Sequence, residues 1–169
     1  MSVNFMRILG IDPGYERLGI AVLEKPSFAK GYGRAKKERV VFSECFKTSA
    51  KLEFSERLNL IGKEIKGVIK KYQPEILAIE TLFLNTNQKT VMRVAEARGV
   101  VIYEASRARL SIFEASPPQI KIATTGYGRA SKEQIKKMVK ILVEVGKNKT
   151  SDDELDAIAI ALTAFAHLR

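Results

Sequence analysis

Four carboxylates at three separate places in the chain have the residue type and position to do chemistry. Asp12 ends an apolar run that begins at residue 7, and Glu80 ends another that begins at residue 76. Asp153 and Asp156 open an apolar stretch near the C-terminus. A carboxylate at the end of a buried strand is costly unless a cation lies beside it. In a chain with a formal net charge of +10, these acids indicate metal ions that face a phosphate backbone.

The spacing of these acids allows them to meet in one place. Asp12 and Glu80 each end a predicted strand, and their carboxylates converge if the two strands are neighbours in a sheet. Asp153 and Asp156 are three residues apart, so they share one face of a helical turn. A helix packed over the strand ends would gather all four acids, which would repel one another without cations. Oxygen ligands of this kind suit Mg²⁺ or Mn²⁺ rather than zinc.

Such a cluster predicts phosphodiester hydrolysis assisted by two metal ions, a reaction that needs neither histidine nor cysteine. The chain contains one cysteine, Cys45, and one histidine, His167. An internal disulfide and a cysteine-based zinc site are therefore excluded, and a Ser-His-Asp or Cys-His mechanism is disfavoured. The near absence of these residues fits the metal-dependent reaction.

Structural explanations exist for some of the acids. Asp12 precedes Pro-Gly and could simply form a turn. Ser151 and Glu154 have the spacing of a helix capping box, in which nearby acidic residues favour the helix N-terminus. These explanations do not account for Glu80 within a buried-looking strand, or for Asp156 before a continuous apolar helix. The four acids together therefore favour the metal site.

Length and composition predict one folded domain over residues 1–169, with residues 1–5 as an N-terminal extension. The 169 residues are 46% hydrophobic, and 29 Lys and Arg residues face 19 Asp and Glu residues. A basic excess of this size makes nucleic acid the commonest partner. The sequence shows no run long enough to span a membrane and no signal-peptide pattern, so we expect a cytoplasmic protein.

Hydrophobic periodicity predicts a mixed α/β fold, in which the first strands of the sheet are antiparallel and the later strands are parallel. Three strands resemble a meander, then helices and strands alternate, and helices follow at the end. The second and third strands are joined by an extended loop over residues 25–39, which holds six basic residues and one acidic residue. We expect strands at 7–12, 17–24, 39–48, 75–80 and 110–115, helices at 54–72, 87–104, 131–145 and 153–168, and helical or turn structure at 117–125.

Four motifs, taken together, resemble the RuvC family of bacterial Holliday junction resolvases. Their order and spacing match that family from about residue 7 to residue 165, and the loop at 25–39 matches least well. The first motif alone is weakly specific, whereas the set in one chain of this length is specific. The motifs are Ile-Leu-Gly-Ile-Asp-Pro-Gly at 8–14, Ala-Ile-Glu-Thr-Leu-Phe at 78–83, Ala-Arg-Gly at 97–99, and Asp-Glu-Leu-Asp-Ala-Ile-Ala-Ile-Ala at 153–161.

The resemblance implies a ribonuclease H-like fold, with a mixed five-stranded sheet whose first three strands are antiparallel and whose faces carry helices. It implies a homodimer that resolves Holliday junctions by paired symmetric nicks in recombination and repair. The expected cofactor is Mg²⁺, replaceable by Mn²⁺, with two ions per active site. Asp12, Glu80, Asp153 and Asp156 fall on the family's four catalytic acids.

Further residues gain expected roles from the same resemblance. Lys121 matches a catalytic basic residue near the scissile phosphate, and Lys132 matches a second basic residue there. Phe83 matches an aromatic that stacks on a base at the junction. The residues themselves, rather than the resemblance, suggest that Arg129 contacts DNA, because it lies in a basic, glycine-containing loop that suits approach to phosphates. The residues alone leave other readings open, because both lysines could be solvated and Phe83 could belong to the core.

The resemblance also places the dimer contact on the helix at 87–104, through Val91, Val94 and Ala95. The small residues of this helix would equally allow packing within one chain. The basic loop at 25–39 has three open roles: contact with a junction arm, contact with a partner such as the RuvA–RuvB branch-migration complex, or simple solvation.

Three other classes of protein share parts of the pattern. Sugar kinases and actin-like ATPases have a similar first motif, but they need a second related domain and a second phosphate motif that this chain lacks. Other ribonuclease H-like nucleases, such as the YqgF group, begin similarly, and the acidic pair at 153 and 156 fits the resolvases better. A non-enzymatic DNA-binding module would explain the charge but not Asp12 and Glu80.

Overall fold

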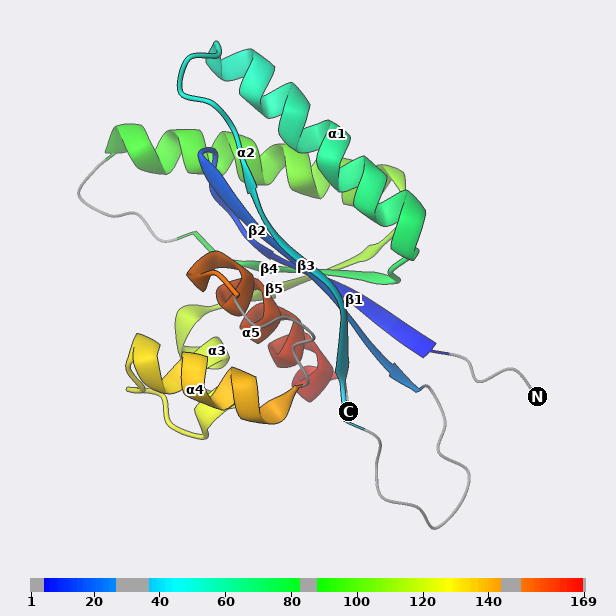
Figure 1. Ribbon diagram of the computed structural model, residues 1–169, viewed down its shortest axis with the longest axis vertical. Helices are drawn as coiled ribbons and strands as arrows, with labels where there is room; N and C mark the ends of the chain where they lie inside the picture. Colours follow the sequence, from blue (N-terminus) through cyan, green and yellow to red (C-terminus); the bar gives the residue numbers. More distant parts are fainter. Residues whose placement is uncertain (1–4, 27–36, 83–87, 144–149, 169) are drawn as a thin grey trace.

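The protein is a three-layer α/β/α structure in which helices cover both faces of one five-stranded sheet (Figure 1). The computed structural model describes residues 5–26, 37–82, 88–143 and 150–168. The elements in chain order are β1 (Phe5–Asp12), β2 (Arg17–Pro26), β3 (Arg39–Lys47), α1 (Phe54–Tyr72), β4 (Ile76–Glu80), α2 (Gln88–Arg107), β5 (Ser111–Ala115), α3 (Pro117–Thr125), α4 (Lys132–Leu142) and α5 (Asp152–His167).

The sheet has the strand order β3-β2-β1-β4-β5. β1 pairs antiparallel with β2, and β2 pairs antiparallel with β3, whereas β4 is parallel to β1 and β5 is parallel to β4. The predicted sheet, with three antiparallel strands and a parallel remainder, is therefore confirmed. Ile11 lies opposite Ile79 across the β1–β4 ladder, so Asp12 and Glu80 end neighbouring strands at the same edge.

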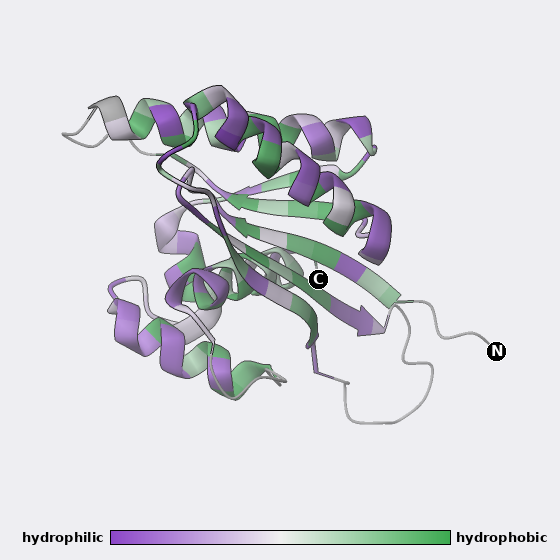
Figure 2. Ribbon diagram, turned by 45° about the horizontal axis from the view of Figure 1, so that its top comes forward, coloured by the Kyte–Doolittle hydropathy of each residue, from purple (hydrophilic) through white to green (hydrophobic). Residues whose placement is uncertain are grey.

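Successive side chains along each strand point to opposite faces of the sheet, so the interior has two hydrophobic cores. Ile8 and Ala78 face a core that is built mainly from the apolar side of α5, with contributions from α3 and α4. Leu9 and Ile79 face the opposite core, which packs against α1 and α2. Figure 2 shows hydrophobic residues concentrated on the sheet and on the helix sides that face it. Because Asp12 and Glu80 follow the even-numbered positions, they belong to the α5 side of the sheet.

Capping residues set the ends of helices α3 and α5. Ser151 caps α5, because its hydroxyl accepts from the Glu154 N–H at 3.3 Å while the Glu154 carboxylate accepts from the Ser151 N–H at 2.9 Å. The predicted capping box is therefore present. Ser116 caps α3 in the same way, and Gly126 ends that helix with a left-handed φ of 74°.

The observed element boundaries differ from the predicted ones by a few residues. β1 begins at Phe5 rather than residue 7, because its ladder with β2 continues to the pair Phe5–Pro26. α2 extends to Arg107, and α4 ends at Leu142 because Val143 has extended backbone angles. Phe83, most of the basic loop and residues 1–4 lie outside the described residues. Within the described part of the chain, no helix has the length and apolar character needed to cross a membrane.

Candidate active site

Two glycines allow helix α5 to lie directly on strands β1 and β2. A Cβ atom on Gly10 would lie 2.2 Å from the Ala157 carbonyl oxygen. A Cβ on Gly19 would lie 2.1 Å from the Asp153 carbonyl oxygen and 3.0 Å from the Cβ of Asp12. Any larger residue at either position would push the helix away from the sheet. This close approach places the first turn of α5 beside the end of β1.

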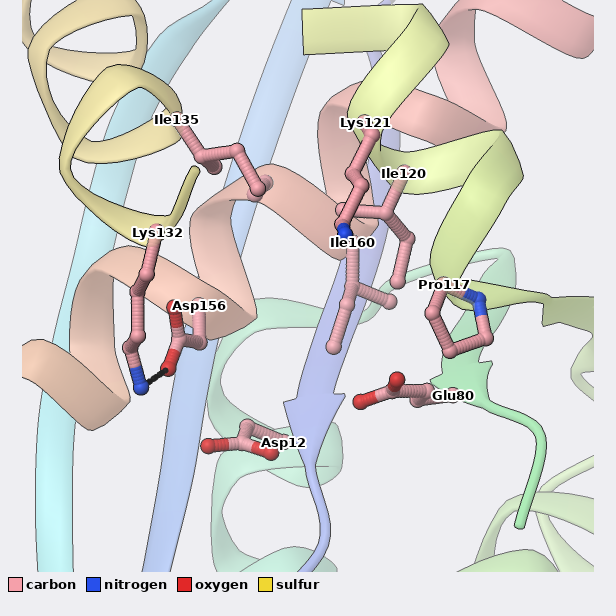
Figure 3. Close-up of a pocket in the computed structure, with 10 residues that line it drawn as sticks. Asp12, Glu80, Pro117, Ile120, Lys121, Lys132, Ile135, Asp156 and Ile160 are labelled. Atoms are coloured by element: carbon pink, nitrogen blue, oxygen red, sulfur yellow. Dashed lines mark ion pairs between the residues drawn. The ribbon is translucent and has the colours of Figure 1, made fainter. Parts of the chain in front are cut away.

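Three of the four predicted acids and both predicted lysines line one pocket, of about 240 Å³. Asp12 comes from the end of β1, Glu80 from the end of β4 and Asp156 from α5. Lys121 on α3 and Lys132 on α4 also line this pocket, with Lys132 beside Asp156, and Figure 3 shows these charged groups around a common space. Apolar side chains from α3, α4 and α5 complete the wall. Five separate elements therefore contribute to one charged cavity.

The electrostatics of this pocket are those of a crowded acidic cluster. Burial, followed by repulsion from Asp156, Glu80 and Asp153, raises the pKa of Asp12 from 3.8 to about 7. Burial and the charge of Asp156 also raise the pKa of Glu80. Lys132 opposes both shifts. The site thus favours additional positive charge next to Asp12 and Glu80.

Cationic side chains already hold the two acids of α5. The Lys132 Nζ lies 2.7 Å from Asp156 Oδ2. Arg17 donates to Asp153 Oδ2 from Nε at 3.0 Å and from Nη2 at 2.5 Å. Burial tends to raise the pKa of Asp153, but the hydrogen bonds from Arg17 and Cys45 outweigh it and hold that pKa below its usual value. Asp153 is therefore ionised under conditions where Asp12 still binds a proton.

The chemistry of this donor set fits a hard divalent cation. Four carboxylates supply only oxygen atoms, which Mg²⁺ and Mn²⁺ prefer, and the raised pKa of Asp12 reflects an excess of negative charge that such an ion would remove. Among the residues that the structure describes, no group of three or more His, Cys, Asp or Glu side chains is arranged closely enough to hold an ion. The ion pairs with Lys132 and Arg17 occupy two of the four carboxylates in this arrangement.

The other predicted residues that the structure describes do not line this pocket. Arg129 is exposed in the turn between α3 and α4. Val91 and Val94 line a second groove of about 490 Å³, which also reaches Asp12 and Glu80. Ala95 is exposed on α2. This second groove makes the acids accessible from the side of α2 as well as from α3 and α4.

Two arginines support the acids but were not predicted as site residues. Arg98 on α2 donates from Nε to the Glu80 carbonyl at 3.0 Å and forms an ion pair with Glu114 on β5. Arg17 holds Asp153. Arg98 belongs to the Ala-Arg-Gly motif, and a single cation between two small residues could have indicated a supporting role for it. No local pattern links Arg17 to an acid 136 residues later in the chain.

Comparison with known proteins gives consistent matches over nearly the whole chain. The family model described as crossover junction endodeoxyribonuclease RuvC matches residues 8–164. The RuvC protein of Halothermothrix orenii is 41% identical over 157 residues, which cover 93% of this chain and 90% of that protein. The RuvC protein of Caldanaerobacter subterraneus subsp. tengcongensis is 40% identical over the same coverage.

Solved structures agree with these sequence matches. Thermus thermophilus RuvC in complex with a Holliday junction substrate is similar with a TM-score of 0.85 and 32% identity, covering 97% of this chain and 95% of that one. The yeast mitochondrial Holliday junction resolvase Ydc2, at 15% identity and a TM-score of 0.67, supports the fold alone. The expected ribonuclease H-like fold is confirmed. With a family model that spans most of its length and relatives at about 40% identity, the chain belongs to the RuvC family of crossover junction endodeoxyribonucleases.

Proposed function

We propose that this chain is a structure-selective endodeoxyribonuclease that resolves four-way DNA junctions by paired, symmetric nicks. The observation that carries the proposal is the single pocket in which Asp12, Glu80 and Asp156 face Lys121 and Lys132. Acids that hold cations and lysines that attract phosphate are the two halves of a phosphodiester-cleaving site. The T. thermophilus relative that this chain resembles is described in complex with a Holliday junction substrate.

The four acids are the proposed catalytic and metal-binding residues. Asp12 and Glu80, at the ends of neighbouring strands, would hold the metal together with Asp153 and Asp156 from α5. The chemistry that two Mg²⁺ ions supply in such a site is activation of a water for in-line attack and stabilisation of the leaving oxygen. We expect Mn²⁺ to replace Mg²⁺, because both are hard cations that favour oxygen ligands.

The two lysines have separable roles in this proposal. Lys121 lines the pocket opposite Glu80 and forms no ion pair among the described residues, so its ammonium is available to a phosphate oxygen. A fixed cation there stabilises charge that grows on the phosphate in the transition state. Lys132 is paired with Asp156 and keeps that carboxylate oriented toward the pocket. Arg129, exposed in the adjacent turn, is a proposed contact to the DNA backbone, and Phe83 remains the proposed stacking residue.

Paired nicking requires two active sites, and the proposed homodimer supplies them. A junction has two-fold symmetry, so a two-fold protein can present one site to each of two strands. The outer face of α2 carries Met92 at 67% exposure, Tyr103 at 59% exposure, and the small residues Ala95 and Gly99 between them. Apolar and small residues of this kind allow two helices to pack closely. We place the dimer contact on this face, next to the groove lined by Val91 and Val94.

The cellular setting of the proposed activity is homologous recombination and DNA repair in the cytoplasm. A resolvase acts on junctions that other proteins move, so the RuvA–RuvB branch-migration complex is a proposed partner. The net charge of +10 supports long-range attraction to the junction backbone.

A cleavage assay on synthetic four-way junctions and matched linear duplexes, with Mg²⁺ and with EDTA, tests the proposal. We expect paired nicks at symmetric positions in the junction only, and only with Mg²⁺. Equal cutting of linear duplex would disprove the resolvase assignment.

Variants separate catalysis from binding in the same assay. Asp12→Asn and Glu80→Gln should abolish cleavage while junction affinity is kept or increases, because removing negative charge cannot weaken attraction to phosphate. Loss of junction binding in both variants would show that these acids serve the fold instead.

A further inference from the structure

Arg17 makes a close contact with one of the four acids, and the RuvC resemblance gives it no role. Its guanidinium donates twice to Asp153 Oδ2, at 3.0 Å from Nε and 2.5 Å from Nη2. Cys45 Sγ donates to the same oxygen at 3.4 Å. One oxygen of this carboxylate therefore accepts three hydrogen bonds from two strands, β2 and β3.

This arrangement fills one of the two oxygens through which Asp153 could bind a metal ion. A carboxylate oxygen has about two lone-pair positions, so three donors leave no room for an ion at Oδ2. The Asp153 Oδ1 atom remains, but an ion bound there would lie close to a permanently charged guanidinium, and the two would repel each other. A divalent cation can bind Asp153 well only if Arg17 moves away.

Arg17 is in a position to move. It is the first residue of β2, and its side chain is 50% exposed while Asp153 is 22% exposed. The side chain can turn from Asp153 into solvent or toward a phosphate without leaving an uncompensated buried charge. Its position differs from that of Arg57, which is buried at 4% exposure.

We propose that Arg17 is a placeholder for the divalent cation, competing with it for Asp153 and lowering the metal affinity of the DNA-free protein. The inference rests on the proposed function, because it assumes that Asp153 is a metal ligand. Without metal, Arg17 offsets the charge of Asp153 and so reduces the repulsion within the acidic cluster. When a cation binds, the Arg17–Asp153 ion pair breaks.

The test measures Mn²⁺ binding by calorimetry and by electron paramagnetic resonance, without DNA and without a cleavage readout. We expect R17Q to bind Mn²⁺ roughly five- to tenfold more tightly than the wild-type protein. R17K keeps the charge and should stay close to wild type. R107Q removes an equally charged but exposed arginine at the far end of α2 and should not change Mn²⁺ affinity. Unchanged or weaker Mn²⁺ binding in R17Q would overturn the proposal.

Two further variants locate the effect. In a D153N background the R17Q substitution should no longer change Mn²⁺ affinity, because the contested carboxylate is gone. D12N should weaken Mn²⁺ binding whether or not Arg17 competes. Wild-type affinity in D12N would therefore count against the metal site itself, whereas weakened binding in D12N with no effect of R17Q would count against Arg17 alone. Thermal denaturation of each variant confirms that it is folded.

Discussion

Arg98 Nε donates a hydrogen bond to the main-chain carbonyl of Glu80 at 3.0 Å, which joins helix α2 to the end of strand β4. The same guanidinium forms an ion pair with Glu114 on β5. Just after this strand end, the Thr81 N–H donates to the Ala115 carbonyl of β5 at 2.9 Å. The Glu80 carboxylate therefore projects from a backbone that is held by its neighbouring strand and by α2, which also carries the proposed dimer face.

We predict that Arg98→Met slows junction cleavage by roughly 100-fold. The substitution removes the hydrogen bond that holds the Glu80 backbone, and a displacement of about 1 Å in a catalytic group lowers the rate by this factor. Arg98→Lys keeps the charge near Glu114 and should recover part of the rate. The loss should appear in kcat rather than KM, since Arg98 acts by holding the Glu80 backbone in place. Single-turnover cleavage with saturating junction measures it.

Two comparisons show whether the effect of Arg98 depends on Glu80. Glu114→Gln removes one ion pair but leaves the hydrogen bond to Glu80, so it should slow cleavage far less than Arg98→Met. Lys70→Met, an exposed cation in the last turn of α1, should have no effect. A change in KM alone for Arg98→Met would make this residue a DNA contact rather than a support for Glu80.

Gly19 and Gly67 form a matched pair for testing the close packing of α5. Gly19→Ala would place a methyl group 2.1 Å from the Asp153 carbonyl oxygen, whereas Gly67→Ala meets nothing within 4 Å. We expect Gly19→Ala to lower the free energy of unfolding by about 1–3 kcal/mol and to reduce cleavage strongly. Gly67→Ala, in the middle of α1, should raise that free energy by about 0.5–1 kcal/mol and leave cleavage unchanged. Urea denaturation with junction cleavage measures both, and equal behaviour of the two variants would contradict the packing argument.

Much of the site could be predicted from the sequence because its parts are local. An apolar run that ends in Asp12 or Glu80 marks a strand-end acid, and the capping residues Ser151 and Glu154 mark the start of α5. Near that start, Asp153 meets Arg17 on β2, and Asp156 lines the pocket with Asp12 and Glu80. The strand order then brings the acids together by the ordinary rules of mixed sheets.

The supporting contacts could not be predicted, because they depend on distances in the folded chain. Arg17 meets an acid 136 residues away, and nothing in either segment indicates the other. Gly10 and Gly19 resemble ordinary strand glycines until α5 is placed on them. The tight packing and the arginine that holds Asp153 are therefore results of the tertiary structure.

The raised pKa of Asp12 predicts that the metal-free protein loses stability as the pH rises from about 4 to about 7. Its pKa is about 7 in the folded protein and near the ordinary 3.8 in the unfolded chain. Between these values the unfolded chain has released the proton that the folded protein keeps, so raising the pH favours unfolding, by up to about 4 kcal/mol. Glu80, whose pKa is also raised, acts in the same direction.

Thermal denaturation in EDTA across this pH range measures the effect. Asp12→Asn should flatten the decline, because it removes the group that titrates. Asp153 does not interfere, since its lowered pKa affects stability only at more acidic pH. Added Mn²⁺ should raise the melting temperature more at pH 8 than at pH 5, where Asp12 holds a proton. A melting temperature that does not depend on pH would contradict the crowded arrangement of the acids.

Lys132 and Lys121 should differ in how they affect the pH dependence of cleavage. Lys132 lowers the pKa of Asp12 and of Glu80, so Lys132→Met should raise both values further. More alkaline solution is then needed to ionise the acids, and the rising limb of the rate profile should move to higher pH. Lys121→Met should reduce the rate without moving this limb, because Lys121 acts on the phosphate in our proposal. Identical profiles for the two variants would mean that the lysines share one role.

Gly99 provides a direct test of the proposed dimer face on α2. It lies on the exposed side of the helix with Met92 and Tyr103, and a Cβ atom there would meet nothing within 4 Å in one chain. Gly99→Glu should therefore leave the fold of the monomer intact. Across a two-fold axis, the same change brings two like charges and two added side chains into the contact. We expect sedimentation equilibrium to show monomers, and junction nicks to become unpaired. Gly67→Glu on α1 adds the same charge away from this face and should remain dimeric, and a Gly99→Glu protein that remains dimeric would place the interface elsewhere.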